Sequence, residues 1–372
     1  MWTRAFGSFF ATSGVKFQSE LCLRGRSPRL LCSRCADECP PGALDLAGRL
    51  PNLQLSRCTE CGVCGAVCPV EAFTLLPSPV DLFANTRERG AVRLACGKLP
   101  GSGETVRVPC HGYLDVTLLT TLGIAAPRGL WLDTSGCLSC EGRRGFSAAK
   151  RSFDAASRLL TVLGLQAEIA FQPDRPQWLG QTNTDVSRRD LLRRLAGKAT
   201  TAAASLVVDL DRQTEGGQSG LPSKQLPLRR RLLLHILRSG SNQTPEMLAA
   251  EGAPWAEPRI GSDCSACLLC VTFCPTAALT AYEDPDHLEI TLDSSRCVAC
   301  DVCAQICPAG AITFVSQLSV ADFVSAHPHL IIDFPKIACP SCGQLFISLP
   351  QAKLCPRCQK DAELEQDVSS WT

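Results

Sequence analysis

The sequence predicts an α+β protein of several domains: two cysteine-rich modules, a central α/β unit with a parallel sheet, a helical linker region and a small four-cysteine tail. Three observations predict this class. Short cysteine motifs recur along the chain, strand and helix patterns alternate between residues 80 and 175, and residues 176–258 contain no cysteine. A chain of 372 residues is long enough for several cores. We expect domains at residues 1–79, 80–175, 176–258, 259–316 and 317–372.

The most regular stretch runs from Cys264 to Pro308 and contains the pattern C-x2-C-x2-C-x3-C-P twice. Bacterial ferredoxins bind a pair of 4Fe–4S clusters with this spacing, and each cluster takes its fourth cysteine from the other run. Eight cysteines in this double register disfavour a zinc site or disulfides. The expected ligand sets are Cys264, Cys267, Cys270 and Cys307 for one cluster, and Cys297, Cys300, Cys303 and Cys274 for the other.

Composition narrows the class of protein further. Lys and Arg total 37 against 36 for Asp and Glu, so charge gives no reason to expect nucleic acid or an anionic membrane as the main partner. The 24 cysteines fall in short registers, which indicates thiolate ligands in a reducing compartment, and we expect a soluble cytoplasmic protein. No run of 18 apolar residues predicts a transmembrane helix, and the start lacks a convincing secretory signal.

Residues 20–76 form a second copy of the double motif with one departure, because Arg29 stands where the first cysteine is expected. One cluster has a full set of ligands in Cys39, Cys58, Cys61 and Cys64. The other has Cys32, Cys35 and Cys68, with Cys22 as the expected fourth ligand; the alternative is a three-iron cluster with Cys22 free. The repeats Cys22–Leu76 and Cys264–Phe314 resemble bacterial two-cluster ferredoxins, which implies two electron-carrying modules.

Residues 80–175 alternate strands with helices, which favours a parallel sheet with crossover helices. The expected strands are Ala91–Ala95, Thr105–Pro109, Gly129–Asp133 and Ala167–Phe171, and the expected helices are Leu114–Leu122 and Ser147–Leu163. Loops that follow parallel strands meet at one edge of the sheet, where ligands usually bind. Cys96, Cys110, Cys137 and Cys140 follow the strands, so we expect them to converge on a metal or cluster site.

The central segment also resembles the delta subunit of methyl-viologen-reducing hydrogenase, a small iron–sulfur subunit that links hydrogenases to heterodisulfide reductases. The resemblance rests on a strand ending in Cys96, on Val-Pro-Cys110-His-Gly-Tyr-Leu-Asp115 and on Gly136-Cys137-Leu-Ser-Cys140. It implies a 2Fe–2S cluster on Cys96, Cys110, Cys137 and Cys140. Around its first strand the family is usually richer in cysteine than Cys96-Gly-Lys-Leu, so zinc stays open as the alternative. His111 could tune a cluster through a hydrogen bond, although we expect a loop histidine to be solvated.

The cysteine-free region, residues 176–258, is expected to be mainly helical with a flexible linker. A helix begins at Ser187 with Asp190 as its capping partner, and Asp211–Pro227 is the Gly/Ser/Gln-rich linker. Ser-Arg-Arg-Asp-Leu-Leu is similar to a twin-arginine export signal, but such signals act at the amino terminus, so we do not expect export. Pro227 and Gly240 bracket a basic helix, Leu228–Arg238, whose arginine run is interpreted as a solvated face. A short helix is expected between Thr244-Pro245 and Gly252.

The tail carries two C-x2-C pairs, Cys339 with Cys342 and Cys355 with Cys358, separated by twelve residues. This arrangement predicts a zinc ribbon with four cysteine ligands, and iron is the alternative. Zinc has no redox chemistry, so the site would be structural or would dock a partner. No basic cluster surrounds it, which disfavours a nucleic-acid-binding ribbon.

The whole inventory predicts an electron-transfer protein. All 24 cysteines are accounted for by four 4Fe–4S clusters, one 2Fe–2S cluster and one zinc ion. No dinucleotide or phosphate-binding fingerprint, histidine metal triad or nucleophile–base pair is present, so no catalytic residue is assigned. We expect a subunit that relays single electrons within a larger oxidoreductase, with hydrogenase-type or other redox proteins as partners. The alternatives are a redox enzyme that acts at the central four-cysteine site, and an iron–sulfur scaffold or docking protein.

Overall fold

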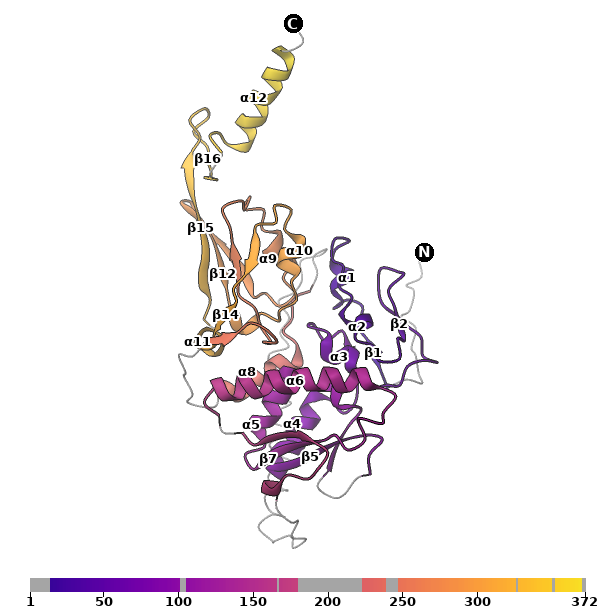
Figure 1. Cartoon of the computed structure of the whole chain (residues 1–372). Coiled ribbons are helices and arrows are strands. Elements are labelled where there is room, and N and C mark those ends of the chain that lie inside the picture. The colour runs from indigo at the N-terminus through magenta and orange to yellow at the C-terminus, as the bar shows by residue number, and fades with distance from the viewer. Residues whose placement is uncertain are drawn as a thin grey trace, which may run out of the picture.

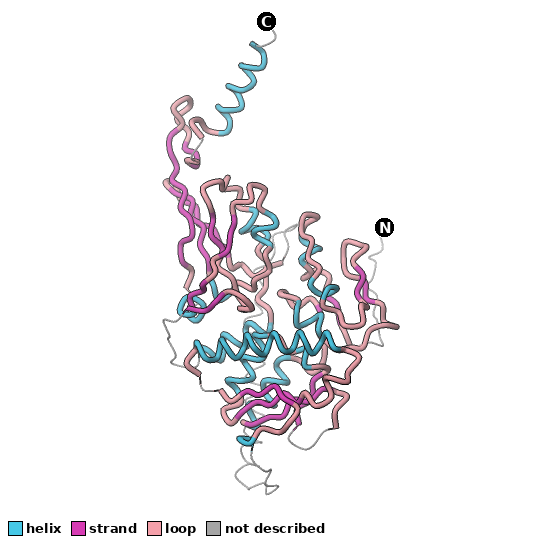
Figure 2. The backbone as a smooth tube through the Cα atoms, viewed as in Figure 1, coloured by secondary structure: helices cyan, strands magenta, loops and turns pink. Residues whose placement is uncertain are grey.

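The computed structural model describes residues 14–100, 105–165, 167–179, 223–238, 247–325, 327–349 and 352–369. Figure 1 shows the central sheet at one end of the molecule, with the two cysteine-rich modules side by side above its helices. The C-terminal ribbon and its helix project beyond the second module. Figure 2 shows that the modules consist mostly of loops joined by short helices and strands. The fold is a mixture of helix and sheet.

The N-terminal module is built from very short elements. Strand β1 (Lys16–Phe17) pairs antiparallel with β4 (Phe73–Thr74), and β2 (Leu44–Asp45) pairs with β3 (Asn52–Leu53). The helices α1 (Leu23–Arg26), α2 (Arg34–Asp37) and α3 (Val63–Val67) have four or five residues each. Helices this short are not stable by themselves. Their stability therefore depends on packing against the rest of the module and on any group that the surrounding loops bind.

The central unit begins with helix α4 (Pro79–Arg89), where Ser78 and Asp81 form a capping box. Its sheet contains β5 (Ala91–Cys96), β6 (Thr105–Val108), β7 (Gly129–Asp133) and β8 (Ile169–Gln172) in the order β6-β5-β7-β8. All three neighbouring pairs are parallel, the arrangement that the alternating sequence pattern predicts. The connections carry the 3₁₀ helix η1 (His111–Tyr113) and the helices α5 (Val116–Ala125) and α6 (Arg143–Val162), and η2 (Gln177–Leu179) follows β8.

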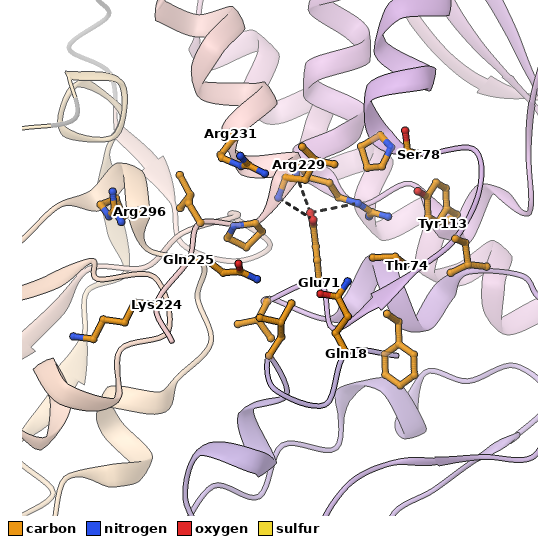
Figure 3. A pocket seen from close by; sticks show the side chains of 18 of the residues that line it. Gln18, Glu71, Thr74, Ser78, Tyr113, Lys224, Gln225, Arg229, Arg231 and Arg296 are labelled. Carbon is orange, nitrogen blue, oxygen red and sulfur yellow. Dashed lines mark hydrogen bonds and ion pairs between the residues drawn. The ribbon is translucent and has the colours of Figure 1, made fainter. Parts of the chain in front are cut away.

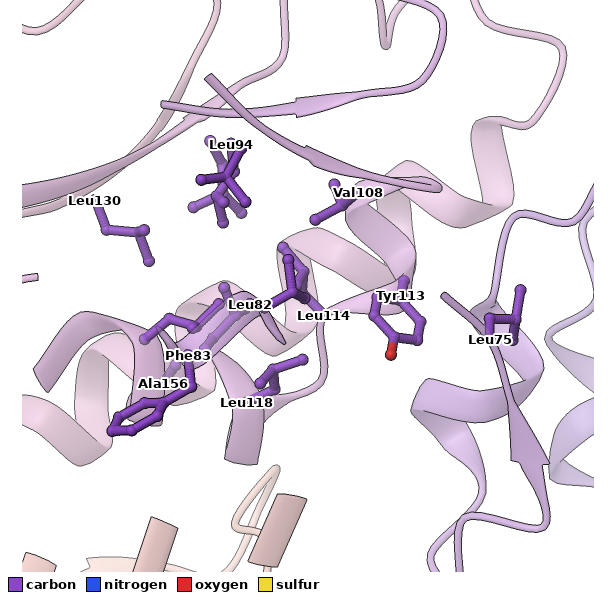
Figure 4. Packing of buried hydrophobic residues seen from close by; sticks show 14 of the residues in the cluster. Leu75, Leu82, Phe83, Leu94, Val108, Tyr113, Leu114, Leu118, Leu130 and Ala156 are labelled. Carbon is purple, nitrogen blue, oxygen red and sulfur yellow. The ribbon is translucent and has the colours of Figure 1, made fainter. Parts of the chain in front are cut away.

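The main hydrophobic core lies between this sheet and its helices and continues into the N-terminal module. Leu94 and Leu130 from the strands, Leu82 from α4 and Leu118 from α5 are all 1% exposed or less. Figure 4 shows these residues packed together, with Leu75 of the N-terminal module at the margin of the cluster. Because one core spans both regions, the module and the sheet unit are packed as one body.

Helix α8 (Leu228–Arg238) has the bounds that Pro227 and Gly240 predict, but its basic face is not solvated as expected. Arg229 and Arg230 are only 4% and 3% exposed. Glu71 of the N-terminal module accepts hydrogen bonds from the backbone N–H groups of Leu228 and Arg229, both at 2.9 Å. Its carboxylate therefore caps the positive end of the helix, as Figure 3 shows. Solvation was the wrong expectation for these two arginines because acceptors distant in sequence surround them.

Arg229 connects three parts of the molecule. Its guanidinium lies 3.2 Å from Asp115 and 3.7 Å from Glu71, and it stacks 4.6 Å from the ring centre of Tyr113. Burial opposes the charge, but Asp115, Tyr113 and Glu71 raise the pKa of Arg229 above its ordinary value. The arginine therefore stays charged, and its partners come from both the N-terminal module and the sheet unit.

The second module pairs β10 (Pro258–Ile260) with β13 (Ile312–Phe314), and contains α9 (Leu269–Phe273), η3 (Ser294–Arg296) and α10 (Val302–Ile306). A four-stranded antiparallel sheet has the order β11 (Leu279–Glu283), β12 (His287–Leu292), β15 (His329–Ala338) and β16 (Leu345–Ile347). Strand β15 thus joins the expected module to the expected tail. Helix α12 (Pro356–Ser369) ends the described chain, in which no helix has both the length and the apolar character needed to cross a membrane.

The helix expected after Thr244-Pro245 is wrong where the structure describes it. Residues Met247–Ala249 form strand β9, which pairs with β14 (Gln317–Ser319), and helix α11 (Val320–Ser325) follows. Leu248 is buried in a second core, where the rings of Trp255 and Phe323 stack 4.1 Å apart. This long-range pairing overrides the local turn signals. The helix expected at Ser187 and residues 211–222 of the expected linker lie outside the described residues.

We predict that Glu71→Ala lowers the free energy of unfolding by about 3 kcal/mol, because it removes the cap of α8 and one partner of a buried arginine. Calorimetric melting of the anaerobically purified chain measures the loss. The matched control is Glu88→Ala, an exposed residue of α4, for which a change within about 0.5 kcal/mol is expected. An equal free energy of unfolding in the two variants would contradict the prediction.

Candidate metal centres

All 24 cysteines are free thiols, and the expected ligand sets divide them into six groups of four. Five groups join cysteines from separate loops or strands of the two modules and the sheet unit. The sixth lies in the ribbon. Burial and the charges that act on each thiol indicate which cysteines lie near one another.

In the N-terminal module, Cys39 lies with the three cysteines of the following loop. Burial raises the pKa of the Cys61 thiol, and the charges of Cys39 and Cys58 raise it further. Burial also raises the pKa of Cys64, with contributions from the same three thiols and from Cys35. Cys39 comes from the first cysteine loop but lies with the cysteines of the second. This is the crossover expected for a two-cluster module.

Cys22 completes the other group of this module. The pKa of Cys35 is raised to about 12. Burial is the largest cause, and the charges of Cys68, Cys32 and Cys22 contribute progressively less. Cys22 begins helix α1, is 8% exposed and packs in one small core with Cys32 and Cys68. Arg29, which replaces the missing cysteine of the motif, is exposed. Cys22 is therefore placed to serve as the fourth ligand.

The central cysteines converge at the carboxyl edge of the parallel sheet. Cys96 ends β5, Cys110 follows β6, and Cys137 and Cys140 follow β7. All four line one cavity of about 410 Å³. Burial raises the pKa of Cys137 to about 12, with contributions from Cys110, Cys96 and Cys140. The sequence predicts this convergence only because loops that follow parallel strands meet at one edge of the sheet.

His111 at this cavity is buried, at 1% exposed, so the expected solvated position is wrong. Its Nε2 lies 3.1 Å from the carbonyl oxygen of Leu94, and its Nδ1 lies 3.6 Å from the sulfur of Cys137. A carbonyl only accepts, so Nε2 carries the proton and Nδ1 faces the sulfur. Helix η1 turns the ring under β5, which the local sequence does not reveal.

In the second module, the thiols of each expected ligand set also lie near one another. Burial raises the pKa of Cys270 to about 11, and the charges of Cys264, Cys267 and Cys307 contribute. Burial likewise raises the pKa of Cys303, with contributions from Cys300, Cys297 and Cys274. The cysteines of this second group also line one small pocket.

The cysteine loops have a backbone that suits an anionic group. In each complete loop the second and fourth residues after the first cysteine have positive φ: Glu60 and Gly62, Ala266 and Leu268, and Ala299 and Asp301. Alternation of right- and left-handed residues turns successive N–H groups inward, as in many iron–sulfur sites. Four thiols and such a concave backbone fit a 4Fe–4S cluster. Leu31 and Ser33, the equivalent residues of the incomplete loop counted from Arg29, do not share the positive φ.

The five groups form a row through the molecule. Cys64 meets the charge of Cys35 in the neighbouring group, and Cys110 of the sheet unit meets the charge of Cys61. A Cβ on Gly62, which follows Cys61, would lie 2.7 Å from the Tyr113 ring, which shows how closely the sheet unit packs against this loop. At the other end, Phe273 and Cys300 of the second module pack against the core around Cys22. Neighbouring groups therefore lie close together between the second module and the sheet.

The ribbon group is tighter. Donor atoms of Cys339, Cys342, Cys355 and Cys358 all lie within 4.8 Å of one another, and the Cys342 and Cys355 sulfurs are 3.7 Å apart. A zinc–sulfur bond of about 2.3 Å gives a tetrahedral edge of about 3.8 Å, so the group fits one tetrahedral ion. The N–H of Cys355 donates to Cys339 at 3.4 Å and is the main cause that lowers the pKa of Cys339 to about 6. A thiolate is thus present near neutral pH.

Sequence reasoning missed the buried arginines near these groups. Arg26 and Arg230 are 8% and 3% exposed, and each meets the charge of a cysteine of the second module. Arg230 belongs to the run that is interpreted as a solvated face, and Arg26 is the last residue of α1. No local signal distinguishes such an arginine from a solvated one.

Comparison with known families supports the two modules. The family model of the 4Fe-4S dicluster domain matches residues 29–72 and again residues 263–311. A search of curated proteins finds no match to the chain. The chain therefore contains two dicluster domains, and these indicate an iron–sulfur electron-transfer protein. The matched ranges do not include Cys22, the sheet unit or the ribbon.

We predict that Cys22→Ser changes the spectrum of a single 4Fe–4S site and removes between about one and four irons per chain, because one ligand of four is lost. Iron analysis and EPR of the reduced protein measure both effects. Cys61→Ser is the comparison, since it should alter the neighbouring site instead. A spectrum and iron content equal to those of the wild type would show that Cys22 is not a ligand.

For the ribbon, Cys358→Ser is expected to remove one zinc ion per chain and to leave the iron content unchanged, because the group fits a single tetrahedral ion. Elemental analysis of the purified chain checks both quantities together. Iron in place of zinc in the wild type, or loss of iron in the variant, would contradict the assignment.

Proposed function

We propose that this chain is an electron-transfer subunit that relays single electrons within a multi-subunit oxidoreductase of the hydrogenase or heterodisulfide-reductase type. The observation that supports the proposal most is the row of five cysteine groups, which extends through both dicluster domains to the edge of the parallel sheet. Bound iron–sulfur clusters supply one-electron chemistry whose potential depends on cluster type, charge, hydrogen bonds and exposure. A continuous row of such sites serves transfer across the molecule rather than a reaction at one place.

In this proposal the chain's own residues hold, shield and tune the sites. Cysteines of the two modules hold four 4Fe–4S clusters, and Cys96, Cys110, Cys137 and Cys140 hold a 2Fe–2S cluster. The core shared by the first module and the sheet unit excludes water around Cys35 and Cys39. The buried ring of His111 packs beside the Cys137 sulfur and shields that side of the site from water. Cysteines that are all free suit a reducing compartment, the cytoplasm.

The ribbon fits a docking role in the same proposal. Cys339, Cys342, Cys355 and Cys358 would hold zinc, which contributes no redox chemistry. The ribbon projects from the second module and lies outside the row of cysteine groups (Figure 1). Leu345 of its hairpin is 52% exposed, and Leu364 of helix α12 is 54% exposed. Exposed apolar side chains at a projecting tip suit contact with a redox partner.

A second candidate function is a redox enzyme that acts at the central site. The cavity of about 410 Å³ there is open to a small molecule, and Nζ of Lys98 lies 4.0 Å from the Cys140 sulfur. A thiol or disulfide substrate would enter beside these groups. Turnover of a disulfide by the isolated chain, lost in Lys98→Met, would favour this function over the relay.

We predict about sixteen to eighteen irons per chain, with matching sulfide and one zinc, after anaerobic purification. A stepwise reductive titration followed by EPR should then show 4Fe–4S and 2Fe–2S signals separately. Cys342→Ser serves as the control, because it should change zinc alone. Eight or fewer irons with several zinc ions would contradict the relay and favour a structural or docking role.

A further inference from the structure

One cysteine group of the second module is surrounded by arginines from outside that module. The group consists of Cys274, Cys297, Cys300 and Cys303, and it faces the N-terminal module. Phe273 and Cys300 pack against the small core formed around Cys22. Arg26 of α1, Arg34 of α2 and Arg230 of α8 all reach this place.

Arg26 is a buried cation with unpaired donors. It is 8% exposed, and Nη2 donates to the carbonyl oxygen of Ser223. Among the described residues, its Nε and Nη1 have no hydrogen-bond partner. Leu23 of the same helix shares one small core with Phe273 and Cys300, which brings α1 against this group, and the charges of Cys274 and Cys300 favour the charged guanidinium. An unpaired buried charge is costly unless an opposite charge lies near it. The negative charge of a group held by four thiolates would supply that partner.

Arg230 fixes the same loop from the opposite element. Its Nη1 donates to the carbonyl oxygens of Cys297 at 2.8 Å and Ser295 at 3.0 Å, and its Nη2 donates to that of Pro254. Burial opposes its charge, but the guanidinium of arginine stays protonated at neutral pH. The arginine therefore positions the first cysteine of the loop and places a charge beside it.

Arg34, a half-exposed arginine of α2, binds the same loop from the N-terminal module. Its Nη2 donates to the carbonyl oxygen of Ala299 at 2.8 Å and to the carboxylate of Asp301 at 2.6 Å. Asp301 is half-exposed and directly follows Cys300, so it places a negative charge at the same loop. The other group of the second module includes Cys267, which is exposed to water. The two sites of this module are thus in different electrostatic surroundings.

We propose that Arg26 and Arg230 raise the one-electron reduction potential of the site formed by Cys274, Cys297, Cys300 and Cys303. The inference rests on the proposed function, since it requires a cluster at this site. A fixed positive charge stabilises the reduced form, which carries one more negative charge, and a buried charge is weakly screened. Both arginines belong to other parts of the chain. The site therefore reaches its working potential only where the two modules and α8 are packed together.

The test measures the midpoint potential of this site in the full chain by EPR-monitored titration, with the signal assigned through Cys300→Ser. Arg26→Met keeps an apolar side chain of similar length in the buried position, so the fold should be kept. We expect the reduction equilibrium to shift at least tenfold toward the oxidised form, which is 59 mV for one electron. Arg26→Lys, which keeps the charge, should restore most of the potential. Arg238→Met, in the exposed last turn of α8, is the matched control.

A second variant, which should raise the reduction potential instead of lowering it, keeps the proposal testable if Arg26→Met does not take up clusters. Asp301→Asn removes a negative charge, and Asn tolerates the positive φ of 62° at this position. Its site should therefore have a higher potential than the wild type. An unchanged potential in a fully loaded Arg26→Met, or in Asp301→Asn, would overturn the role of these charges. A wild-type chain without a cluster at this site would overturn the relay as well, and iron analysis distinguishes the two failures.

Discussion

The ion pairs of Arg229 hold the parts of this protein in their relative positions. The arginine is buried where the N-terminal module, the sheet unit and α8 meet, and it has an acidic partner from each of the first two. Burial of a charge without partners is strongly unfavourable, so the arrangement is stable only when Glu71 and Asp115 are both in place. Glu71 also caps α8, which orients the helix that carries Arg230 to the second module. The packing of the two modules against each other thus depends on this network.

Given that packing, the row of cysteine groups follows from the internal geometry of the modules. In the expected ligand sets, each loop contributes one cysteine to the group of the other loop. Burial is the main cause of the raised pKa values of thiols such as Cys35, Cys137 and Cys270, so metal binding at these thiols must displace protons. Cluster binding and folding are therefore coupled, as the short helices of the modules also indicate.

Much of this could be predicted from the sequence, for physical reasons that differ between parts. The strand-terminal positions of Cys96 and Cys110 place them together because parallel strands end at a common edge. The bounds of α8 could be predicted because Pro227 favours a helix start and Gly240 favours a helix end. Cys22 could be assigned because no other nearby cysteine was left without a group.

Burial of charged and polar side chains could not be predicted in the same way. Arg229 and Arg230 are buried because Glu71, Asp115 and backbone carbonyls from distant segments accept their hydrogen bonds, and a single sequence does not show these contacts. His111 is buried by a single turn of 3₁₀ helix after β6. Strand β9 forms only because β14 offers it a partner about seventy residues later. In each case tertiary contacts decide what local propensity leaves open.

Strand β15 has a mechanical consequence. One continuous strand of 10 residues pairs with β12 in the second module and then with β16 in the ribbon, so no hinge separates the two. At about 3.3 Å per residue it acts as a spacer of fixed length. Removal of two residues would shorten this spacer by about 7 Å and leave the ribbon facing the same way, whereas removal of one would turn the ribbon to the opposite face. Whatever binds the ribbon is held at a set distance and orientation from the second module.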